Sequence, residues 1–378
     1  MKGRFVVFIL VLFYFINFAY SYVNVSSCME INDTILDGSR EVKMNGSLFN
    51  LSVSVCFQLN ANNFVFDCQG NLIQGNGSSD FSYGLYTSGL QLYTNVTIKN
   101  CVLSDWGTNM YLQDFDLSVI NNVTSNNSLN YGIYFRDFDS SNLTNSRFNN
   151  NQLYGIYVSR PDGTNHFENL EVKDNFGHDL YHQSLLSSFR CNDNYTNITT
   201  TNGLQFGYFN SPSSLIENQN FSLLVFCNAA NSVVRNVSLV NSGTNGVFQY
   251  LTNLVTYDNV RFVNNGMLSF SNTENFNNSY FENNPSYSSI SNSKFNNNTF
   301  YNQNLNFVFN GVWNFSNLGN RYLKSDGTGF SQTCADVDNN SICDTYYNIT
   351  TGSVDFFPQY VLYTPVASNP IFLLPVFG

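Results

Sequence analysis

Basic side chains are scarce in this sequence. Only 11% of its residues are charged, and 15 lysines and arginines stand against 26 aspartates and glutamates, which gives a formal net charge of −11. A surface that binds nucleic acid needs clustered lysine and arginine, so the composition argues against a nucleic-acid partner. An acidic surface suits cations, neutral glycans or solubility outside a cell.

Long apolar runs are absent after the N-terminus. Lys2 and Arg4 precede an apolar run at residues 5–18, and small residues follow at 19–21. This order predicts a secretory signal peptide at residues 1–21 that is cleaved near Ser21. No later run is long enough to span a bilayer. We therefore expect a secreted or cell-surface protein that meets a membrane only through its signal segment.

The sequence contains no phosphate-binding glycine loop, nucleophile elbow or zinc signature. Its even number of cysteines in an exported chain predicts disulfides. About twenty Asn-x-Ser/Thr sequons predict a glycoprotein. The eight cysteines are Cys28, Cys56, Cys68, Cys101, Cys191, Cys227, Cys334 and Cys343.

An internal repeat dominates the middle of the chain. Three segments align without gaps, Met110–Asp116, Ile133–Asp139 and Ile156–Asp162, so the period is about 23 residues (133 − 110 and 156 − 133). Apolar and polar residues alternate within them, which is typical of strands. Stacked coils of short strands bury a continuous core. We therefore predict an all-β, right-handed, single-stranded parallel β-helix. A leucine-rich repeat has a similar period, but its consensus is absent.

Asparagine and glycine mark the expected corners of each coil. Asparagine tolerates the left-handed backbone of a sharp corner, and equivalent asparagines one coil apart can bond in a ladder, which we predict for Asn100, Asn122, Asn145 and Asn169. The pairs Tyr131-Gly132 and Tyr154-Gly155 predict another corner, with glycine supplying a positive φ.

The repeat defines three regions after the signal peptide. Residues 22–62 are expected to form an N-terminal cap with the first strands, and residues 63–310 the β-helix. An irregular segment at about 188–232 interrupts the repeat. We expect a disulfide between Cys191 and Cys227 to hold this segment. After Asn259 the coils should shorten, since two similar motifs begin close together, at Phe276 and at Ile290. Residues 311–378 form a C-terminal loop region.

Two stretches resemble a known group. Phe64-Val-Phe-Asp-Cys-Gln-Gly70 and Asn95-Val-Thr-Ile-Lys-Asn-Cys101 are similar to the opening coils of the pectin-lyase-like superfamily, especially archaeal β-helix surface proteins. The region 313–358 is similar to the tail of the periplasmic copper-binding protein NosD family. The resemblance implies Cys28–Cys56 and Cys68–Cys101 disulfides. Copper itself fits badly with oxidised cysteines and few histidines.

The repeat predicts an axial column of carboxylates. Asp116, Asp139 and Asp162 share one register, and three side chains lie beside them in sequence, Asp114, Asp137 and Arg160. Coils about 4.8 Å apart would place neighbouring carboxylates at a distance that suits a retaining glycosidase or a bridging Ca²⁺. The alternative is that Asp recurs because one turn was duplicated, each side chain capping its own backbone.

Two further sets of residues suggest a metal-binding site. His166, His178 and His182 fall within one coil, although clustering without a role is the simpler explanation. The tail loop carries oxygen ligands at the alternating positions of a calcium loop, with Ser in place of the usual Gly and Tyr347 in place of the final Glu. An alternative is a turn stapled by a Cys334–Cys343 disulfide, and both can hold. The loop ligands are Asp336, Asp338, Asn340, Ile342 and Asp344.

These patterns favour a non-catalytic surface glycoprotein that binds glycans or another cell-surface component. Tyr134 and Tyr157 are expected to point outward, where they can stack on sugars, although they are also ordinary strand residues. The alternatives are a polysaccharide lyase or glycoside hydrolase that acts through the Asp column, and a structural spacer without a ligand. Calcium is the one cofactor that the sequence suggests.

Overall fold

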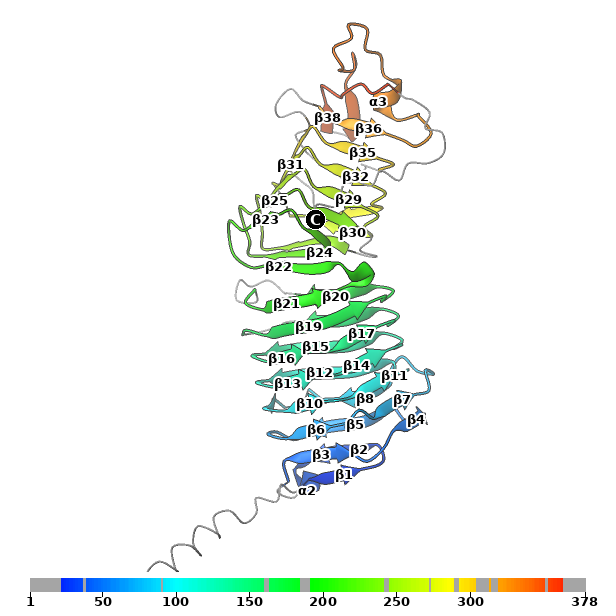
Figure 1. The fold of residues 1–378 in the computed structure, drawn as a ribbon, viewed down its shortest axis with the longest axis vertical. Helices are drawn as coiled ribbons and strands as arrows, with labels where there is room; N and C mark the ends of the chain where they lie inside the picture. The colour runs from blue at the N-terminus through cyan, green and yellow to red at the C-terminus, as the bar shows by residue number, and fades with distance from the viewer. Residues whose placement is uncertain are drawn as a thin grey trace, which may run out of the picture.

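A computed structural model describes residues 22–36, 39–89, 91–159, 163–183, 191–240, 245–271, 273–288, 292–303, 313, 319–350 and 353–362. The signal peptide predicted at residues 1–21 lies outside them. The chain winds into a long stack of coils whose strands run parallel from one coil to the next (Figure 1). This arrangement confirms the predicted all-β parallel β-helix. The described helices are short, and they are α2 (Asp33–Leu36), α3 (Phe330–Thr333) and the 3-10 turn η2 (Thr201–Gly203).

The strands form three parallel sheets and one hairpin. Sheet A contains 23 strands: β1 (Val23–Val25), β3 (Glu41–Met44), β4 (Leu48–Leu51), β6 (Val65–Asp67), β7 (Leu72–Gly75), β10 (Thr97–Lys99), β11 (Val102–Ser104), β13 (Val119–Asn121), β14 (Thr124–Asn126), β16 (Asn142–Thr144), β17 (Arg147–Asn149), β19 (His166–Lys173), β21 (Asn194–Thr199), β22 (Gln205–Phe209), β24 (Asn220–Cys227), β26 (Ser238–Val240), β27 (Asn245–Tyr250), β29 (Arg261–Val263), β30 (Met267–Ser269), β32 (Tyr280–Glu282), β33 (Ser286–Ser288), β35 (Thr299–Tyr301) and β36 (Arg321–Leu323). Sheet B contains β2 (Met29–Asn32), β5 (Val55–Asn60), β8 (Tyr83–Tyr86), β9 (Tyr93–Thr94), β12 (Thr108–Asp116), β15 (Tyr131–Asp139), β18 (Tyr154–Ser159) and β20 (His178–Gln183). Sheet C contains β23 (Leu215–Glu217), β25 (Val233–Arg235), β28 (Thr256–Asp258), β31 (Asn275–Asn277) and β34 (Lys294–Asn296), and the hairpin is β37 (Tyr347–Thr350) with β38 (Ser353–Asp355).

The predicted period is the spacing of equivalent residues in adjacent coils. Met110 is the direct partner of Ile133, and Ile133 is the partner of Ile156. The same interval of 23 residues separates Ser118 from Ser141, whose side chain accepts the Ser118 N–H. A typical coil has one long strand of sheet B followed by two short strands of sheet A, as in β12, β13 and β14. The coils therefore enclose a three-sided core.

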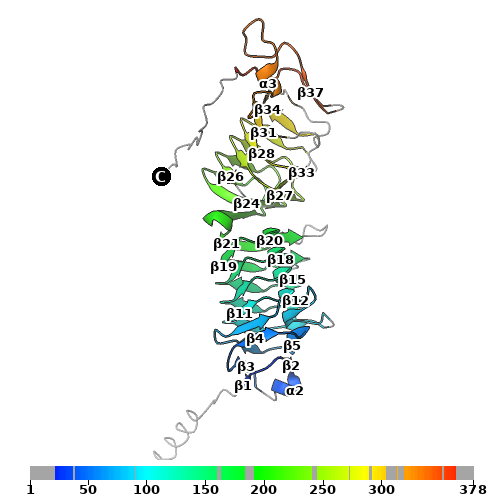
Figure 2. The same ribbon diagram turned by 90° about the vertical axis from the view of Figure 1, so that its right-hand side faces the viewer.

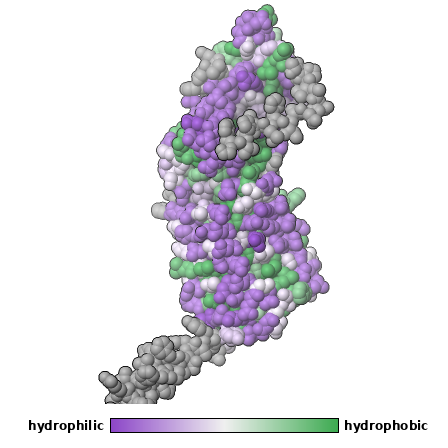
Figure 3. Space-filling model, viewed as in Figure 1, coloured by the Kyte–Doolittle hydropathy of each residue, from purple (hydrophilic) through white to green (hydrophobic). Residues whose placement is uncertain are grey.

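Inward positions stack apolar side chains along the axis. Ile98, Ile120, Leu143 and Phe167 are successive partners in sheet A, and each is fully buried. The outward positions alternate with them and are mostly polar, and the face drawn in Figure 3 is largely hydrophilic. Burial of one side of every short strand is the main force that holds the coils together.

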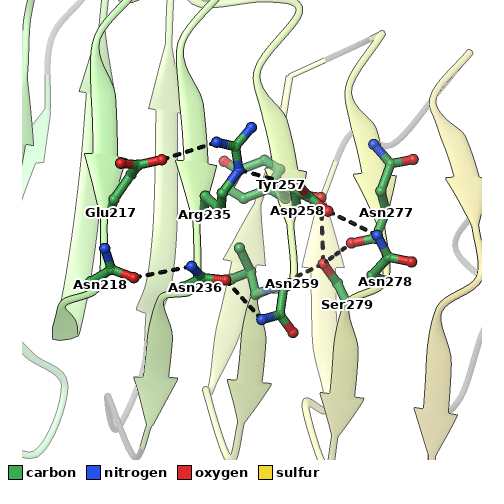
Figure 4. A network of polar contacts seen from close by, with 11 residues as sticks. Glu217, Asn218, Arg235, Asn236, Tyr257, Asp258, Asn259, Asn277, Asn278 and Ser279 are labelled. Atoms are coloured by element: carbon green, nitrogen blue, oxygen red, sulfur yellow. Dashed lines mark hydrogen bonds and ion pairs between the residues drawn. The ribbon is translucent and has the colours of Figure 1, made fainter. Parts of the chain in front are cut away.

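An asparagine ladder follows one outer corner, as predicted. Asn100, Asn122, Asn145 and Asn169 all have left-handed backbones, with φ between 52° and 55°. Asn122 Nδ2 donates to Asn100 Oδ1 at 2.8 Å, and Asn169 Nδ2 donates to Asn145 Oδ1 at 3.2 Å. A second ladder joins Asn218, Asn236 and Asn259 beside sheet C, next to the ion pairs of Arg235 with Glu217 and Asp258 (Figure 4).

Buried ladders line the inner corners. In each ladder a Ser or Asn side chain accepts the backbone N–H of the coil before it, and the last Asn donates to a carboxylate. The three ladders are Ser118, Ser141, Asn165 and Asp193; Ser128, Asn151, Asn175 and Asp179; and Ser279, Asn298, Asn320 and Asp355. A carboxylate only accepts hydrogen bonds. It can therefore accept from both the backbone N–H and the side-chain amide of the last Asn, and so it can end the ladder.

The stack has two blocks, which we name the first block (residues 23–199) and the second block (residues 205–323). The parallel order breaks between them, where β21 and β22 pair antiparallel through Thr199 and Gln205. The core also divides into two hydrophobic clusters. The break lies within the irregular segment predicted at about 188–232, and the Cys191–Cys227 disulfide links its two sides. At the two ends of sheet A, β1 pairs parallel with β3, and β36 pairs parallel with β35.

All four expected disulfides are present. They join Cys28 to Cys56, Cys68 to Cys101, Cys191 to Cys227 and Cys334 to Cys343. Disulfides are typical of proteins from oxidising compartments. Neither described α-helix has the length and apolar character that a membrane span requires.

The second block keeps the 23-residue interval between Val234 and Tyr257, and the coils that follow are shorter, but the spacing predicted from the motifs at Phe276 and Ile290 is wrong. Tyr257 pairs with Phe276, and Phe276 pairs with Phe295. These coils repeat every 19 residues, the interval that also separates Glu274 from its partner Ser293. The two motifs are not equivalent, since their last residues, Phe281 and Phe295, belong to β32 of sheet A and β34 of sheet C.

The predicted tyrosine–glycine corner is also wrong. Tyr131-Gly132 and Tyr154-Gly155 begin β15 and β18, and neither glycine has a positive φ. Glycine is needed because a Cβ on Gly132 would lie 2.6 Å from the Gly155 carbonyl oxygen, and one on Gly155 would lie 2.5 Å from Val172 Cγ1. Close packing, and not a turn, explains these glycines.

Candidate functional site

Aromatic side chains cover the outer face of sheet B in the first block. We name this surface, formed by β8, β12, β15, β18 and β20, the tyrosine face; most of its strands stack one above another in Figure 2. Its side chains form two neighbouring axial columns. The longer column is Tyr86, Tyr111, Tyr134, Tyr157 and Tyr181, and the shorter one is Tyr131, Tyr154 and His178.

The central rings of the longer column are regularly spaced and nearly parallel, whereas the end pairs Tyr86–Tyr111 and Tyr157–Tyr181 are tilted by 27° and 22°. The centroids of Tyr111 and Tyr134 are 4.8 Å apart with planes at 2°, and those of Tyr134 and Tyr157 are 4.9 Å apart at 7°. In the shorter column, His178 lies 4.9 Å from Tyr154 at 3°. Inner rings therefore cover much of one another's faces, and the column presents ring edges and hydroxyl groups.

A local irregularity brings the second column to the same face. Tyr131 and Tyr134 are three residues apart, so strict alternation would point them to opposite sides of the strand. Gly132 and Ile133 are both buried, and the regular pairing omits Gly132, so one extra inward residue restores Tyr131 to the outside. Tyr131 and Tyr134 consequently contact each other, with centroids 5.3 Å apart. The same pair of consecutive buried residues recurs in β18 at Gly155 and Ile156, and the strands keep a constant register.

The aromatic groups stay uncharged at neutral pH. Burial, followed by neighbouring phenols, raises the pKa of Tyr131 and of Tyr157 above the usual value. Burial lowers the pKa of His178 to about 4. The tyrosine face thus presents neutral hydroxyl groups, each able to donate and accept a hydrogen bond.

An acidic margin runs along one side of the tyrosine face. Asp116 and Asp139, two members of the predicted column, are direct partners in adjacent coils. Asp114 and Asp137 lie beside them at left-handed positions, with φ of 52° and 49°. Arg136 is the one cationic residue in the five strands of the face, and its Nε lies 3.8 Å from Asp137 Oδ2.

The carboxylate of Asp139 in this column makes contacts with nearby residues. Ser140 Oγ donates to Asp139 Oδ1 at 2.9 Å, and the same oxygen lies against the backbone of Gly163. Asp162 and Arg160, which were predicted to extend the column, lie outside the described residues. The described part of the chain contains no group of three or more His, Cys, Asp or Glu that could hold a metal ion.

The three histidines do not form one site. His178 stacks on Tyr154 and Tyr181, whereas His182 is buried and places Nε2 2.9 Å from Asp193 Oδ2. His166 is exposed on β19, where it pairs with Asn142. Each histidine therefore has its own surroundings.

The tail loop is held by its own backbone. Asp336 Oδ1 accepts the N–H of Asn340 at 3.0 Å, and Asp336 Oδ2 accepts that of Ser341 at 3.1 Å. Asp344 Oδ2 accepts the N–H of Val337 at 2.8 Å. Ser341 has φ of 67°, so it adopts the left-handed conformation that glycine provides in a standard calcium loop. The predicted ligands also include Asp338 and Ile342, but Asp336, Asp338 and Asp344 do not come together as a group of three carboxylates that could hold a metal ion, and calcium binding stays a prediction.

Sequence reasoning found Tyr134 and Tyr157 but missed the other aromatic residues of the face. Tyr86, Tyr111 and Tyr181 share their register and could have been found by extending the repeat by one or two coils. The shorter column could not be found by alternation, because two consecutive buried residues change which side the residue before them faces.

Comparison with known proteins supports the fold. Residues 35–194 match the family model described as right handed beta helix region. A DFA-IIIase from Arthrobacter chlorophenolicus A6, solved in complex with GF2, is similar at 10% identity and a TM-score of 0.32, covering 83% of this chain and 85% of that one. The alginate lyase from Paenibacillus sp. str. FPU-7 is similar at 10% identity and a TM-score of 0.29, covering 80% and 97%.

The A-module of the Azotobacter vinelandii mannuronan C-5 epimerase AlgE4 is also similar, at 11% identity and a TM-score of 0.30, covering 81% of this chain and 84% of that module. No curated protein matches the sequence. The resemblance of the tail to the NosD family stays a prediction. The fold is that of a right-handed parallel β-helix, and residues 35–194 carry the sequence pattern of the right-handed β-helix region.

Proposed function

We propose that this protein is a secreted or cell-surface β-helix that binds carbohydrate on its tyrosine face without cleaving it. The observation that carries the proposal is the pair of outward aromatic columns, since Tyr111, Tyr134 and Tyr157 repeat in register over adjacent coils. Aromatic rings with polar ends suit a partner that has both apolar C–H surfaces and hydroxyl groups. Carbohydrates have that combination.

The polar margin adds hydrogen-bonding groups beside the rings. The Tyr111 hydroxyl donates to Gln113 Oε1 at 3.3 Å, and Arg136 also bonds this hydroxyl. Sugar hydroxyls can donate to carboxylates and accept from guanidinium groups, so both residue types beside the rings are useful for recognition.

The placement of the sequons supports an open tyrosine face. Asn95 and Asn122 lie at corners, and Asn126 and Asn142 belong to sheet A strands β14 and β16. The sequences of β8, β12, β15, β18 and β20 contain no sequon asparagine. N-linked glycans on this block would therefore leave the tyrosine face accessible to a ligand.

A retention assay tests the proposal. The purified full-length protein is passed over immobilised neutral and acidic polysaccharides, with and without Ca²⁺, beside a variant with Tyr111→Ser, Tyr134→Ser and Tyr157→Ser. We expect the wild type to be retained and the folded variant to elute early. Tyr280→Phe in the second block is the control, because that ring lies beneath Arg261 and away from the face. Absence of retention on every polysaccharide would favour a structural spacer and reject the proposal.

A polysaccharide lyase or glycoside hydrolase is the second candidate, because Asp116 and Asp139 are partners in adjacent coils. Coils about 4.8 Å apart place two carboxylates near the separation used by retaining glycosidases. The same screen measures new reducing ends and unsaturated products. Cleavage that is lost in Asp139→Asn would establish the enzyme and reject the non-catalytic proposal.

A further inference from the structure

We infer that the ligand of the tyrosine face is an extended, neutral polysaccharide that lies along the axis of the stack. This inference rests on the proposed function, and it specifies the class and orientation of the glycan. Three features carry it: the direction in which the rings repeat, the repeat length, and the charge beside them.

The direction follows from where the rings lie on each strand. Along one strand, the tyrosines occupy only the first residues, and charged positions such as Arg136 and Asp137 come next. Along the axis, the longer column continues through five coils, from Tyr86 to Tyr181. A linear chain that runs along the axis contacts every member of the column, whereas a chain that crosses the axis contacts one or two tyrosines.

The spacing of the rings along the axis favours an extended glycan. Successive centroids in the longer column are separated by 5.5, 4.8, 4.9 and 5.2 Å. This spacing, set by coils about 4.8 Å apart, is close to the length that one sugar adds to an extended chain of diequatorially linked pyranoses. One sugar can therefore face one coil without losing register over five coils. A coiled glycan, in which each sugar advances less, would not keep this match.

The negative charge beside the rings favours a neutral glycan. Asp114, Asp116, Asp137 and Asp139 line one side of the rings, and Arg136, the one cation in these strands, lies between Asp137 and the Tyr111 hydroxyl. A chain of uronic acids would bring a carboxylate to each coil beside this margin, and like charges at such distances repel. Neutral sugar hydroxyls can instead donate to these oxygens.

The stacking geometry specifies how the rings bind. The plane of Tyr134 lies within 7° of the planes of Tyr111 and Tyr157, so these three rings largely cover one another's faces. Their hydroxyl groups and edges remain as the contact surface. Loss of one hydroxyl should therefore weaken binding even when the ring is retained.

Calorimetric titration of the full-length protein with linear β-1,4-xylo-oligosaccharides of two to six sugars tests the inference. We expect affinity to rise with length until about five sugars, one for each coil of the longer column. Tyr134→Phe, which keeps the stack intact, should weaken binding of the longest chain by about threefold to tenfold. Tyr280→Phe should bind as the wild type does.

A parallel titration with oligogalacturonates of equal length tests the charge. We expect no binding or at least tenfold weaker binding, and recovery when Asp116 and Asp139 are both changed to Asn. Tighter binding of oligogalacturonates by the wild type would overturn the neutral class. Affinity that is independent of length, or unaffected by Tyr134→Phe, would overturn the axial arrangement.

These outcomes differ from failure of the proposed function. If the retention assay detects binding that requires the tyrosine face but the titrations fail in one of these ways, the inference is wrong and glycan binding stands. If no polysaccharide is retained, both are wrong.

Discussion

Asn165 donates both its backbone N–H and its side-chain amide to one oxygen of Asp193, at 3.1 and 2.9 Å. The other carboxylate oxygen of Asp193 bonds His182, and all three residues are buried. This carboxylate therefore satisfies the last asparagine of an inner ladder and a histidine at the end of the first block.

Replacement of Asp193 should destabilise the first block strongly. Asp193→Ala leaves both donors of Asn165 and the ring of His182 without a partner, so we expect the free energy of unfolding to fall by about 3 kcal/mol. Asp193→Asn keeps an acceptor for Asn165 and should cost about 1 kcal/mol. Urea denaturation followed by circular dichroism measures both. Equal losses in the two variants would show that the ladder does not depend on the acceptor.

Glu274 should make the second block less stable as pH rises. Its side chain is buried, and burial raises its pKa to about 8 while Ser271 and the Val255 N–H oppose this shift. The unfolded chain loses the proton near the ordinary value of 4.5, so between pH 4.5 and 8 the native state binds more protons. The stabilising contribution of protonated Glu274 is complete below pH 4.5, and it is lost as the pH rises towards 8.

The measurement is the unfolding free energy at pH 5 and pH 8. We expect the wild type to lose about 2–4 kcal/mol over this interval, and Glu274→Gln to lose much less. Glu282→Gln, a partly exposed position on β32, is the matched control. A wild-type protein that is equally stable at both pH values would contradict the buried protonated carboxyl.

His178 should produce the opposite dependence in the first block. Burial lowers its pKa from 6.5 to about 4, so the unfolded chain takes up a proton first as pH falls. Between pH 6.5 and 4 the native state is therefore destabilised, by about 1–3 kcal/mol after allowance for partial solvent exposure. His178→Tyr should abolish this loss and continue the ring column, because Tyr154 offers it a stacking partner.

Thermal unfolding at pH 7 and pH 4.5 measures this effect. His166→Gln, at an exposed position, serves as the control and should keep the pH dependence. A dependence that persists in His178→Tyr would assign it to another group.

The tail loop should bind calcium if its oxygen donors act together. We expect calorimetry on the full-length protein to detect Ca²⁺ binding with a Kd of about 0.1–1 mM, the range of extracellular calcium modules. Asp336→Asn should abolish it, since that carboxylate holds the loop through two backbone N–H groups. Asp326→Asn, in a neighbouring turn, should bind normally. No heat of binding in the wild type would reject a calcium site.

Much of the fold could be predicted because stacking requires similar residues at equivalent positions. The pairing of Met110 with Ile133 is visible in the sequence as a repeated motif, and the corner asparagines recur at nearly the same interval. The length of the coils in the second block was missed because short Asn-rich and Phe-rich segments resemble one another on different strands. Similarity between β31 and its neighbours therefore gave a false spacing.

The candidate site was predictable only in part. Tyr134 follows the strand alternation, whereas Tyr131 faces the same way only because Gly132 and Ile133 are both buried. The charge beside the rings was visible as repeated aspartates. The role of Asp193 was not, because its partner Asn165 lies 28 residues earlier and only the coil stack brings them together.

The carboxylate-terminated ladders have a consequence for how such a protein can change in length. Each internal Ser or Asn needs only an acceptor in the coil that follows, and only the last position needs an Asp. Duplication of a whole coil between Ser118 and Asp193 would leave every bond of the ladder in place, and in the tyrosine-bearing coils it would add one more ring to the column. Gene duplication could therefore lengthen the tyrosine face in single steps, with the terminating aspartate unchanged.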